Sequence, residues 1–253
     1  PNDSYNSSTQ DNSSILIDSC GMEVTTSLNL DSDINNCEGH GFDIKEENIT
    51  INCGGYKING GSNSLNGINA SYDNLTIKDC KIEGFHYGIF ADTTNNSLII
   101  RNNITQIRYV GILLEQSDNF KIIDSILEEN DLLDIYSDKG THLLINTSFN
   151  YSRVEIDDEG ELFVKWYLDT NVTNSSLDLL ENANIRIIDV LQNEITLTTN
   201  LTGSITRQNI TEYIKDDTEK QNLNNYTINT SKESYHTNIT QLNITDNEKL
   251  SIK

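Results

Sequence analysis

Short apolar runs, each separated from the next by Asn, Asp and Gly, recur along the first part of the chain. The segments "YGIFAD" (87–92), "VGILLE" (110–115) and "LDIYSD" (133–138) follow one another every 23 residues, and "NGINAS" (66–71) precedes them by 21. A repeat this short has no room for a helix, and its β-branched residues favour strands. The pattern therefore predicts very short strands joined by turns, stacked as the coils of a parallel β-helix.

A second series of apolar runs lies between the members of the first, so both belong to one repeat. It consists of "LTIKDCKI" (75–82), "LIIRNNI" (98–104), "FKIIDSI" (120–126) and "LLINTSF" (143–149). We expect each coil to contribute a few inward aliphatic side chains that stack on their equivalents about 4.8 Å away. The corners need residues that tolerate left-handed backbone, and Asn side chains can bond from coil to coil, so Asn102 and Asn103 are predicted corner residues.

The repeat ends near residue 151, where a different pattern begins. The segment "VEIDDEGELFVKWYLDT" (154–170) predicts a hairpin around Asp158 to Gly160. Alternating strands follow at "NIRIIDV" (184–190), "EITLTTNL" (194–201), "YTINTS" (226–231) and "KLSIK" (249–253). The predicted fold is all-β: a polar tail over 1–14, a parallel β-helix over 15–153 and an antiparallel immunoglobulin-like β-sandwich over 154–253.

Two stretches resemble a known family. They are "CGMEVTTSLNLDSDINNCEGHGFDIKEENITINCGGYKING" (20–60) and "NLTIKDCKIEGFHYGIF" (74–90). Together they look like the opening coils of archaeal right-handed parallel β-helix surface proteins, which are related to periplasmic copper-processing and carbohydrate-binding β-helix repeats. The resemblance covers roughly residues 15–150 and implies the fold, whereas lyases, hydrolases, adhesins and envelope proteins all use such coils.

The last hundred residues resemble a second family. The segments "ENANIRIIDV" (181–190), "TRQNITEYIK" (206–215) and "YTINTSKESY" (226–235) are similar to the carboxypeptidase-regulatory-like sandwich that often follows the β-helix in archaeal surface proteins. One departure is that the Gly expected after Asp189 is missing in "DVLQNE". The turn of that hairpin is therefore left undefined.

The charge of the chain excludes several kinds of partner. With 17 basic against 39 acidic residues, the net charge is -22, which argues against nucleic acid and anionic membranes because Lys and Arg supply phosphate binding. No apolar stretch approaches the roughly 20 residues that span a bilayer. The sequence opens at Pro1 without a signal-like segment, so we interpret it as a processed, mature form.

Asparagine is unusually frequent in glycosylation sequons. The 35 Asn and 47 Ser plus Thr give a chance expectation of about 6 to 7 Asn-x-Ser/Thr motifs, and the chain has 18. This excess predicts N-linked glycans on a secreted, extracellular surface. The acceptors are Asn2, Asn6, Asn12, Asn48, Asn69, Asn74, Asn95, Asn103, Asn146, Asn150, Asn171, Asn174, Asn200, Asn209, Asn225, Asn229, Asn238 and Asn243.

The four cysteines, Cys20, Cys37, Cys53 and Cys80, also indicate a secreted, extracellular protein. They form no CxxC pair and have no His at zinc-ligand spacing, so disulfides are favoured over a metal. Four cysteines allow three connectivities. We favour Cys20 with Cys37 and Cys53 with Cys80, because each pair closes a local loop.

The catalytic candidates are weak. The "EGHGFDIK" segment (38–45) echoes the GHG of polygalacturonases, where a His assists paired carboxylates, yet the companion Asp pair and the Arg-x-Lys are absent from later coils. Asp157 with Asp158, and Asp216 with Asp217, could act as acid and base. Both pairs fall in predicted turns, where Asp is chosen for its side chain to backbone bonds. We therefore predict no catalytic residue and no enzyme.

Metal binding also has little support. His40, His86, His142 and His236 are scattered, and the chain has no EF-hand or nonapeptide calcium repeat. Calcium stays a candidate for acidic clusters such as Asp31 with Asp33, or 157–159. No other cofactor is expected.

Two functions remain in competition. The first is a structural, glycosylated envelope protein that assembles with copies of itself into a filament, sheath or surface layer. The second is a carbohydrate-binding or carbohydrate-active β-helix protein. Aromatic residues make up only 7% of the chain, which favours the first. The tail 1–14 has one large apolar side chain, Tyr5, and we expect a neighbouring copy to hold it.

Overall fold

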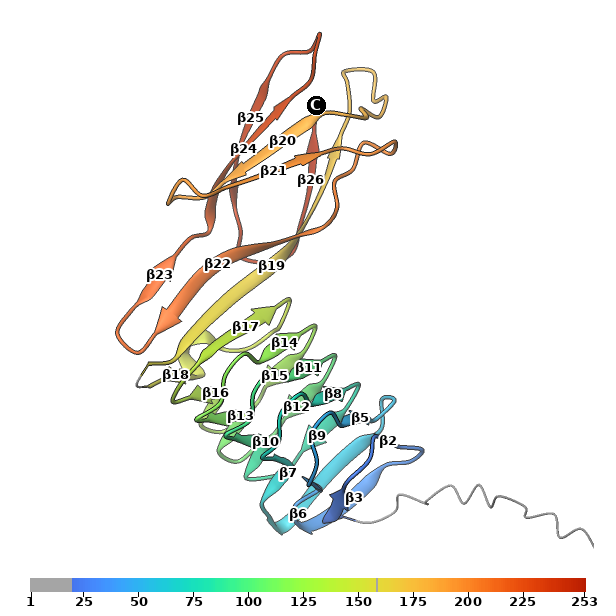
Figure 1. Cartoon of the computed structure of the whole chain (residues 1–253), viewed down its shortest axis with the longest axis vertical. Helices are drawn as coiled ribbons and strands as arrows, with labels where there is room; N and C mark the ends of the chain where they lie inside the picture. Colours follow the sequence, from blue (N-terminus) through green and yellow to red (C-terminus); the bar gives the residue numbers. More distant parts are fainter. Residues whose placement is uncertain (1–19, 158) are drawn as a thin grey trace, which may run out of the picture.

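The computed structural model describes residues 20–157 and 159–253 (Figure 1). Within them, stacked parallel coils lead into an antiparallel β unit, and the one helical element is the 3-10 turn η1 (Tyr151–Arg153). No helix in this part of the chain is long and apolar enough to cross a membrane. The predicted tail 1–14 and Asp158 lie outside the described residues.

Three sheets form the sides of the coils. Sheet A contains β1 (Met22–Val24), β4 (Phe42–Ile44), β7 (Asn66–Ala70), β10 (Tyr87–Asp92), β13 (Val110–Glu115), β16 (Leu133–Ser137) and β18 (Val154–Ile156). Sheet B starts with β2 (Leu28–Asn29), β5 (Thr50–Asn52), β8 (Thr76–Lys78), β11 (Leu98–Ile100), β14 (Lys121–Ile123), β17 (Thr141–Ile145) and β19 (Glu161–Val172). Sheet C contains β3 (Ile34–Gly39), β6 (Lys57–Ser64), β9 (Lys81–Glu83), β12 (Asn103–Thr105) and β15 (Ile126–Glu128).

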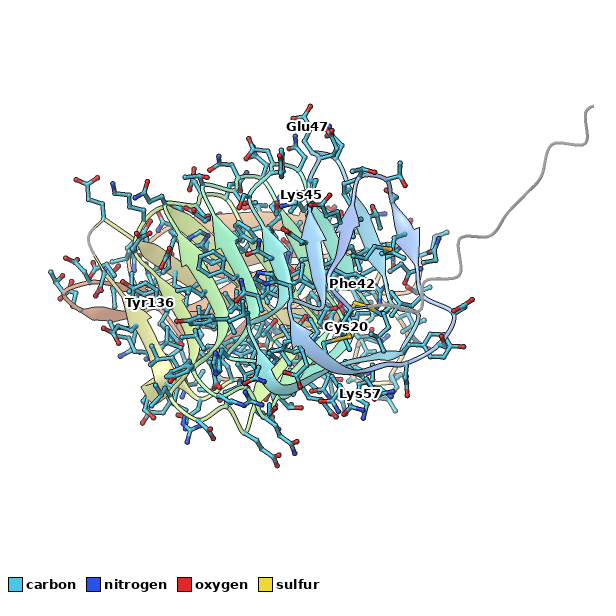
Figure 2. All side chains as sticks on the ribbon, turned by 90° about the horizontal axis from the view of Figure 1, so that it is seen from below. Cys20, Phe42, Lys45, Glu47, Lys57 and Tyr136 are labelled. Carbon is cyan, nitrogen blue, oxygen red and sulfur yellow. A yellow bond between two sulfur atoms is a disulfide. The ribbon has the colours of Figure 1, made fainter. Side chains whose placement is uncertain are left out.

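The predicted aliphatic ladders are confirmed. In sheet A, Ile89 pairs in parallel with Ile112, which pairs with Ile135, and all three side chains are fully buried. Sheet B stacks Ile77, Ile99, Ile122 and Leu144 in the same way. Each coil thus buries apolar area against identical neighbours, while charged side chains such as those of Glu47 and Lys57 project outward in the view from the N-terminal end (Figure 2).

A glycine ladder explains why Gly recurs in the repeat. A Cβ on Gly88 would lie 2.5 Å from the carbonyl oxygen of Gly111, and a Cβ on Gly67 would lie equally close to that of Gly88. The backbone of the next coil therefore leaves no room for a side chain. Asp134 takes the next place, fully buried, and its carboxylate accepts hydrogen bonds from Asn130 Nδ2 and the Asn150 N–H. Burial raises the pKa of Asp134.

The corner prediction is right about asparagine ladders and about Asn102, which lies in the corner between β11 and β12, and wrong about Asn103. Asn119 Nδ2 donates to Asn96 Oδ1 at 2.7 Å across one coil, as predicted. The left-handed residue at the other corner is Arg101, with φ of 54°. Asn102 is buried, donates to the Ile77 carbonyl and accepts from the Cys80 N–H, whereas Asn103 begins β12.

The predicted hairpin over 154–170 is wrong. β18 pairs in parallel with β16 in sheet A, while β19 pairs in parallel with β17 in sheet B. The turn at Gly160 is therefore a coil corner that joins two sheets. Parallel pairing of the coils therefore continues past the predicted end of the β-helix at residue 153. It reaches Lys165, which pairs with Ile145.

The C-terminal unit has two layers. Sheet D contains β21 (Glu194–Thr198), β20 (Asn184–Ile188), β24 (Asn225–Ser231) and β25 (Asn238–Asn243), all antiparallel. The second layer, which sheet D faces, consists of the C-terminal half of β19 together with β22 (Gln208–Asp216) and β26 (Glu248–Ile252). β23 (Lys220–Asn222) pairs with β22. Leu168, Val172, Ile187 and Ile228 contribute to the core between the layers.

Two details correct the predicted sandwich. β26 pairs in parallel with β19, so the unit is not purely antiparallel. The hairpin that lacks its Gly still forms, because Gln192 adopts φ of 67° and Asp189 Oδ1 accepts from the Leu191 and Asn193 N–H groups. Polar side-chain bonds replace the glycine here.

The two regions are joined by continuous backbone and by side-chain contacts. β19 belongs to both, with a register shift between Val164 and Lys165 in its pairing with β22. The Tyr167 hydroxyl donates to Asp124 Oδ1 at 3.0 Å, and Asn247 Nδ2 donates to Asn146 Oδ1 at 2.6 Å. These bonds fix the last coil against the C-terminal unit.

Candidate functional site

The outer face of sheet A combines apolar and acidic side chains. Ile89 and Ala91 point inward and are fully buried, so Phe90 between them points outward and is half-buried. The parallel register continues this outward row through Leu113 to Tyr136. We call Tyr87, Phe90, Tyr109, Leu113 and Tyr136 the aromatic face.

Neighbouring coils bring the rings of this face together. The Tyr87 ring lies 5.9 Å from Phe90 and 6.0 Å from Tyr109, centroid to centroid, and His86 meets Tyr109 edge-on at 5.2 Å. These rings are half-buried except that of Tyr109, which is exposed, and the tyrosines add a polar hydroxyl to the apolar area. In the sequence, the signal is the residue directly after each inward isoleucine of the repeat. The sequence-based prediction did not consider this position.

Carboxylates border the aromatic face on one side. Asp92 pairs in register with Glu115, and burial, followed by the repulsion of Asp92 and Asp138, raises the pKa of Glu115. The Tyr136 hydroxyl donates to Asp157 Oδ2 at 2.9 Å, and burial together with this bond raises the pKa of Tyr136 to about 12. Rings beside hydrogen-bond acceptors can bind a polar ligand that has apolar faces, such as a sugar.

The sequence-predicted catalytic candidates do not form a common site. His40 Nδ1 is buried without a hydrogen-bond partner among the described residues, and the companion Asp pair and Arg-x-Lys of its motif are absent from the matching later coils of the sequence. Asp157 holds Tyr136 and its neighbour Asp158 lies outside the described residues. Asp216 Oδ1 accepts the N–H groups of Thr218 and Glu219, which lowers the pKa of Asp216 and closes a turn.

The remaining histidines have separate surroundings. His142 is fully buried; its Nδ1 accepts from the Phe120 N–H at 3.3 Å and its Nε2 lies 2.9 Å from the Lys139 carbonyl. This arrangement suits the neutral ring, and burial lowers the pKa of His142. His86 packs on Tyr109, while His236 is exposed near the C-terminal end of the molecule.

The carboxylates of the predicted calcium cluster at Asp31 and Asp33 accept local hydrogen bonds. Asp33 Oδ1 accepts the Lys57 N–H at 2.8 Å, and Asp31 Oδ1 accepts the Ser32 hydroxyl at 3.1 Å. In residues 20–157 and 159–253, no group of three or more His, Cys, Asp or Glu side chains could hold a metal ion.

Both predicted disulfides are confirmed. Cys20 bonds to Cys37 and Cys53 to Cys80, with Cα–Cα distances of 5.1 and 4.7 Å. Both lie in the first coils. Cys37 belongs to β3, Cys53 directly follows β5 and Cys80 directly precedes β9. Figure 2 shows sulfur atoms near the Cys20 label.

The sequon asparagines share one property, which is access to solvent. Asn2, Asn6 and Asn12 lie outside the described residues, and none of the other 15 is buried. The buried asparagines in the described part of the chain are Asn66, Asn102 and Asn130, and each lies outside a sequon. The exposed sequon asparagines are Asn48, Asn74, Asn150, Asn171, Asn200, Asn209, Asn225 and Asn243.

The half-buried sequons differ in whether their amide nitrogen is engaged. Asn69, Asn95, Asn146, Asn174 and Asn238 donate a hydrogen bond through Nδ2, the atom to which a glycan would attach. Asn103 and Asn229 instead have a buried Oδ1 without a partner among the described residues. The described sequons therefore fall into an exposed set, an internally bonded set and the half-buried pair Asn103 and Asn229.

Comparison with known proteins identifies the class. The family described as "Right handed beta helix region" matches residues 15–160, more than half of the chain. The protein therefore belongs to the right-handed β-helix family. No curated protein matches it.

Proposed function

We propose that the chain is a structural, heavily N-glycosylated protein of the cell exterior, of the archaeal surface type that it resembles, whose copies assemble into a filament, sheath or layer. In this proposal the β-helix is a rigid rod without catalytic activity. The C-terminal unit is its carboxypeptidase-regulatory-like, immunoglobulin-type sandwich. The two facing layers around Ile187 and Leu168 support that assignment.

One observation carries the proposal. Among the described residues, the three buried asparagines of the coils lie outside sequons, and no sequon asparagine is buried. If sequons were only a by-product of an Asn-rich β-helix, buried corner positions such as Asn102 and Asn130 would carry them as often as exposed ones. The excess of 18 sequons over about 6 to 7 expected is therefore a surface property, which fits a glycan coat. Two disulfides are compatible with an extracellular location.

Glycopeptide mass spectrometry of native protein tests the proposal. We expect sugar at a majority of sequons, including Asn103, Asn171 and Asn238, and higher occupancy at Asn171 and Asn209 than at the internally bonded Asn146. Site-resolved fragmentation should place no sugar on the non-sequon Asn66 and Asn102, which stand close in sequence to the sequons at Asn69 and Asn103 and are the internal control. Unmodified peptides at most sequons would refute the glycan coat.

The aromatic face favours a second candidate, a saccharide-binding protein without hydrolytic activity. Phe90, Tyr87 and Tyr136 would stack on sugar rings while Asp92 and Glu115 accept hydroxyl protons. Tyr87→Ala should then weaken retention on immobilised neutral polysaccharide, whereas Tyr235→Ala, far from this face, should not. Equal retention of both variants would exclude this candidate.

A further inference from the structure

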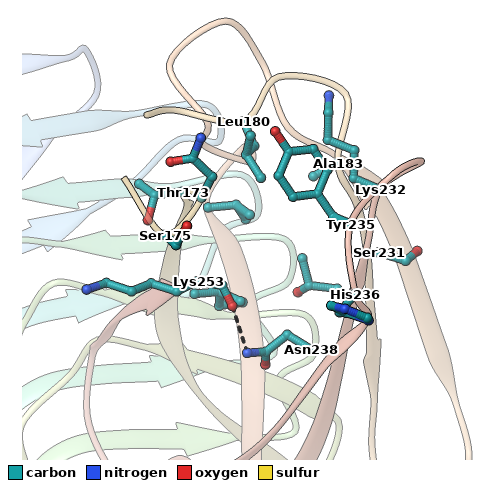
Figure 3. A pocket seen from close by; sticks show the side chains of 14 residues that line it. Thr173, Ser175, Leu180, Ala183, Ser231, Lys232, Tyr235, His236, Asn238 and Lys253 are labelled. Atoms are coloured by element: carbon teal, nitrogen blue, oxygen red, sulfur yellow. Dashed lines mark hydrogen bonds between the residues drawn. The ribbon is translucent and has the colours of Figure 1, made fainter. Parts of the chain in front are cut away.

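A pocket opens in the C-terminal unit (Figure 3), at the end of the molecule farthest from the first coils in Figure 1. It has a volume of about 230 Å³ and lies between the loop that follows β19, the loop between β24 and β25, and the end of β26. Val172, Leu180, Ala183 and Ile252 form an apolar floor and are buried. The half-exposed Tyr235 forms part of the rim (Figure 3).

The charge of this pocket is opposite to that of the whole chain. Lys232 and Lys253 line it, and none of its lining residues is Asp or Glu, although the chain carries a net charge of -22. The pocket therefore attracts an acidic partner more strongly than the remaining surface does.

The pocket also contains an unused hydrogen-bonding group. Thr230 is 5% exposed and its Oγ1 has no partner among the described residues. A buried hydroxyl without a partner costs free energy. Rotation about the Cα–Cβ bond of Thr230 sacrifices no hydrogen bond, so a polar atom entering the pocket would give this hydroxyl its first partner.

We propose that this pocket binds Tyr5 of a second copy of the chain, so that residues 1–14 link copies head to tail. This rests on the proposed assembly of copies. The β-helix family match begins at residue 15, and Tyr5 is the single large apolar side chain before it. A tyrosine has an apolar ring for the floor and a hydroxyl for Thr230.

The sequence of the tail fits such binding in an extended form. Alternate side chains of an extended segment point to opposite sides. Asp3, Tyr5 and Asp11 occupy odd positions, whereas all three sequon asparagines of the tail, Asn2, Asn6 and Asn12, occupy even ones. The acidic and aromatic side can thus face the cationic pocket while glycans point away.

The geometry determines what the contact builds. The first coils, which follow the tail in the sequence, and the pocket lie at opposite ends of the molecule (Figure 1). A contact between unlike ends that does not close on itself generates a linear polymer.

Sedimentation velocity of the full chain as a function of concentration tests the proposal. We expect wild-type protein to assemble, Tyr5→Ala to need at least about tenfold more protein for half-assembly, and Tyr5→Phe to need only a few times more. A labelled peptide of residues 1–14 should bind the full-length Tyr5→Ala chain. Addition of excess unlabelled peptide should shorten wild-type assemblies.

A double-mutant cycle locates the contact. With Thr230→Val, the difference between Tyr5 and Tyr5→Phe should disappear. Thr227→Val, in the same strand but bonded to Gln241 on sheet D, is the matched control and should keep that difference. Both substitutions nearly conserve volume, so circular dichroism should show intact protein.

Three results would overturn the proposal. They are assembly of Tyr5→Ala at wild-type concentrations, failure of the peptide to bind, and wild-type protein that stays monomeric at every concentration although the peptide binds the Tyr5→Ala chain, which would mean that each chain fills its own pocket. If glycans are present and copies assemble without Tyr5, the link is wrong while the proposed function stands. Absence of both glycans and assembly would refute the proposed function itself.

Discussion

The β-helix and the C-terminal unit solve the same packing problem in different ways. In the β-helix, Ile112 meets Ile89 and Ile135 because each coil repeats the last. The C-terminal core instead pairs unlike residues from two layers, such as Ile187 and Leu168. Three of the five buried polar atoms without partners in the described residues belong to that unit, on Thr170, Asn229 and Thr230. Translation by one coil repeats each bonding position and leaves His40 Nδ1 and Asn103 Oδ1 as the exceptions in the described coils, whereas a sandwich lacks that symmetry.

The largest effect should come from breaking one ladder. Ile112→Ala removes stacked contacts on both sides and should cost about 2–5 kcal/mol of unfolding free energy. Ile187→Ala is the matched change in the other core. Urea unfolding by circular dichroism reports mainly on the coils, and the fluorescence of Trp166, packed against the C-terminal core, reports on that unit. Identical shifts of both signals by either variant would mean that the two regions unfold as one.

The disulfides should stabilise only the β-helix. The Cys53 to Cys80 bridge has a sequence separation of 27, which gives about 3–4 kcal/mol in the loop-entropy model. Reduction should therefore accelerate hydrogen exchange in the first coils, which have no coil before them, and leave sheet D unchanged. Unchanged exchange in strands β1 to β6 after reduction would contradict this.

The glycine ladder predicts a smaller effect with a specific signature. Gly88→Ala places a Cβ 2.5 Å from both the Gly111 carbonyl oxygen and Ile104 Cγ2, and should cost about 1–3 kcal/mol. Adding Ile104→Ala deletes Cγ2 and so removes only one of the two clashes, once the cost of Ile104→Ala alone is subtracted. Thermal unfolding should show that the double variant recovers little, because the backbone oxygen remains. Full recovery would mean that the backbone clash is unimportant.

Acid should weaken the last coils through His142. Burial lowers the pKa of this ring in the folded protein, so the unfolded chain binds the proton more tightly. The stability contributed by neutral His142 is fully present above the pKa of about 6.5 that the ring has in the unfolded chain. Below that pH the free energy of unfolding decreases by at most about 1.4 kcal/mol per pH unit. His142→Gln removes the titration. The difference in unfolding free energy between wild type and variant should therefore change between pH 7.5 and 5, and a constant difference would argue against it.

The smallest effect concerns the corner ion pair. Arg101 binds Asp79 through two bonds of 2.7 and 2.9 Å, with about half of the Arg side chain exposed. Such surface pairs contribute about 1 kcal/mol or less. Arg101→Gln should therefore lower the urea midpoint only slightly, and less still in high salt. A loss comparable to that of Ile112→Ala would show that corner charges, rather than the ladders, hold the coils.

The repeat made the β-helix predictable because one pattern is sampled several times. Ile89, Ile112 and Ile135 stand at equal spacing in the sequence, and equal spacing translates directly into register. Local loop closure likewise gave the correct disulfide pairs. The corner residue Arg101 was missed because a left-handed Arg, paired with Asp79, has no propensity signal of its own.

Where the repeat ends, sequence reasoning had only local patterns. The Asp and Gly between β18 and β19 are typical of a hairpin, yet tertiary pairing sends the two strands to different sheets. The aromatic face and the pocket depend on side chains from distant segments, such as Leu180 and Ile252. Only the solvent-facing pattern of the sequons could be anticipated, because glycosylation acts on single short motifs.

The shared strand β19 determines how the molecule would carry a load. Its first half lies between β17 and β22, and its second half pairs with β26. Tension applied along this strand loads many backbone hydrogen bonds in shear at the same time, rather than opening them one after another. A pull on the C-terminal unit is thus transmitted into the stacked coils through one unbroken backbone, which makes the junction a tether under tension as well as a boundary between two cores.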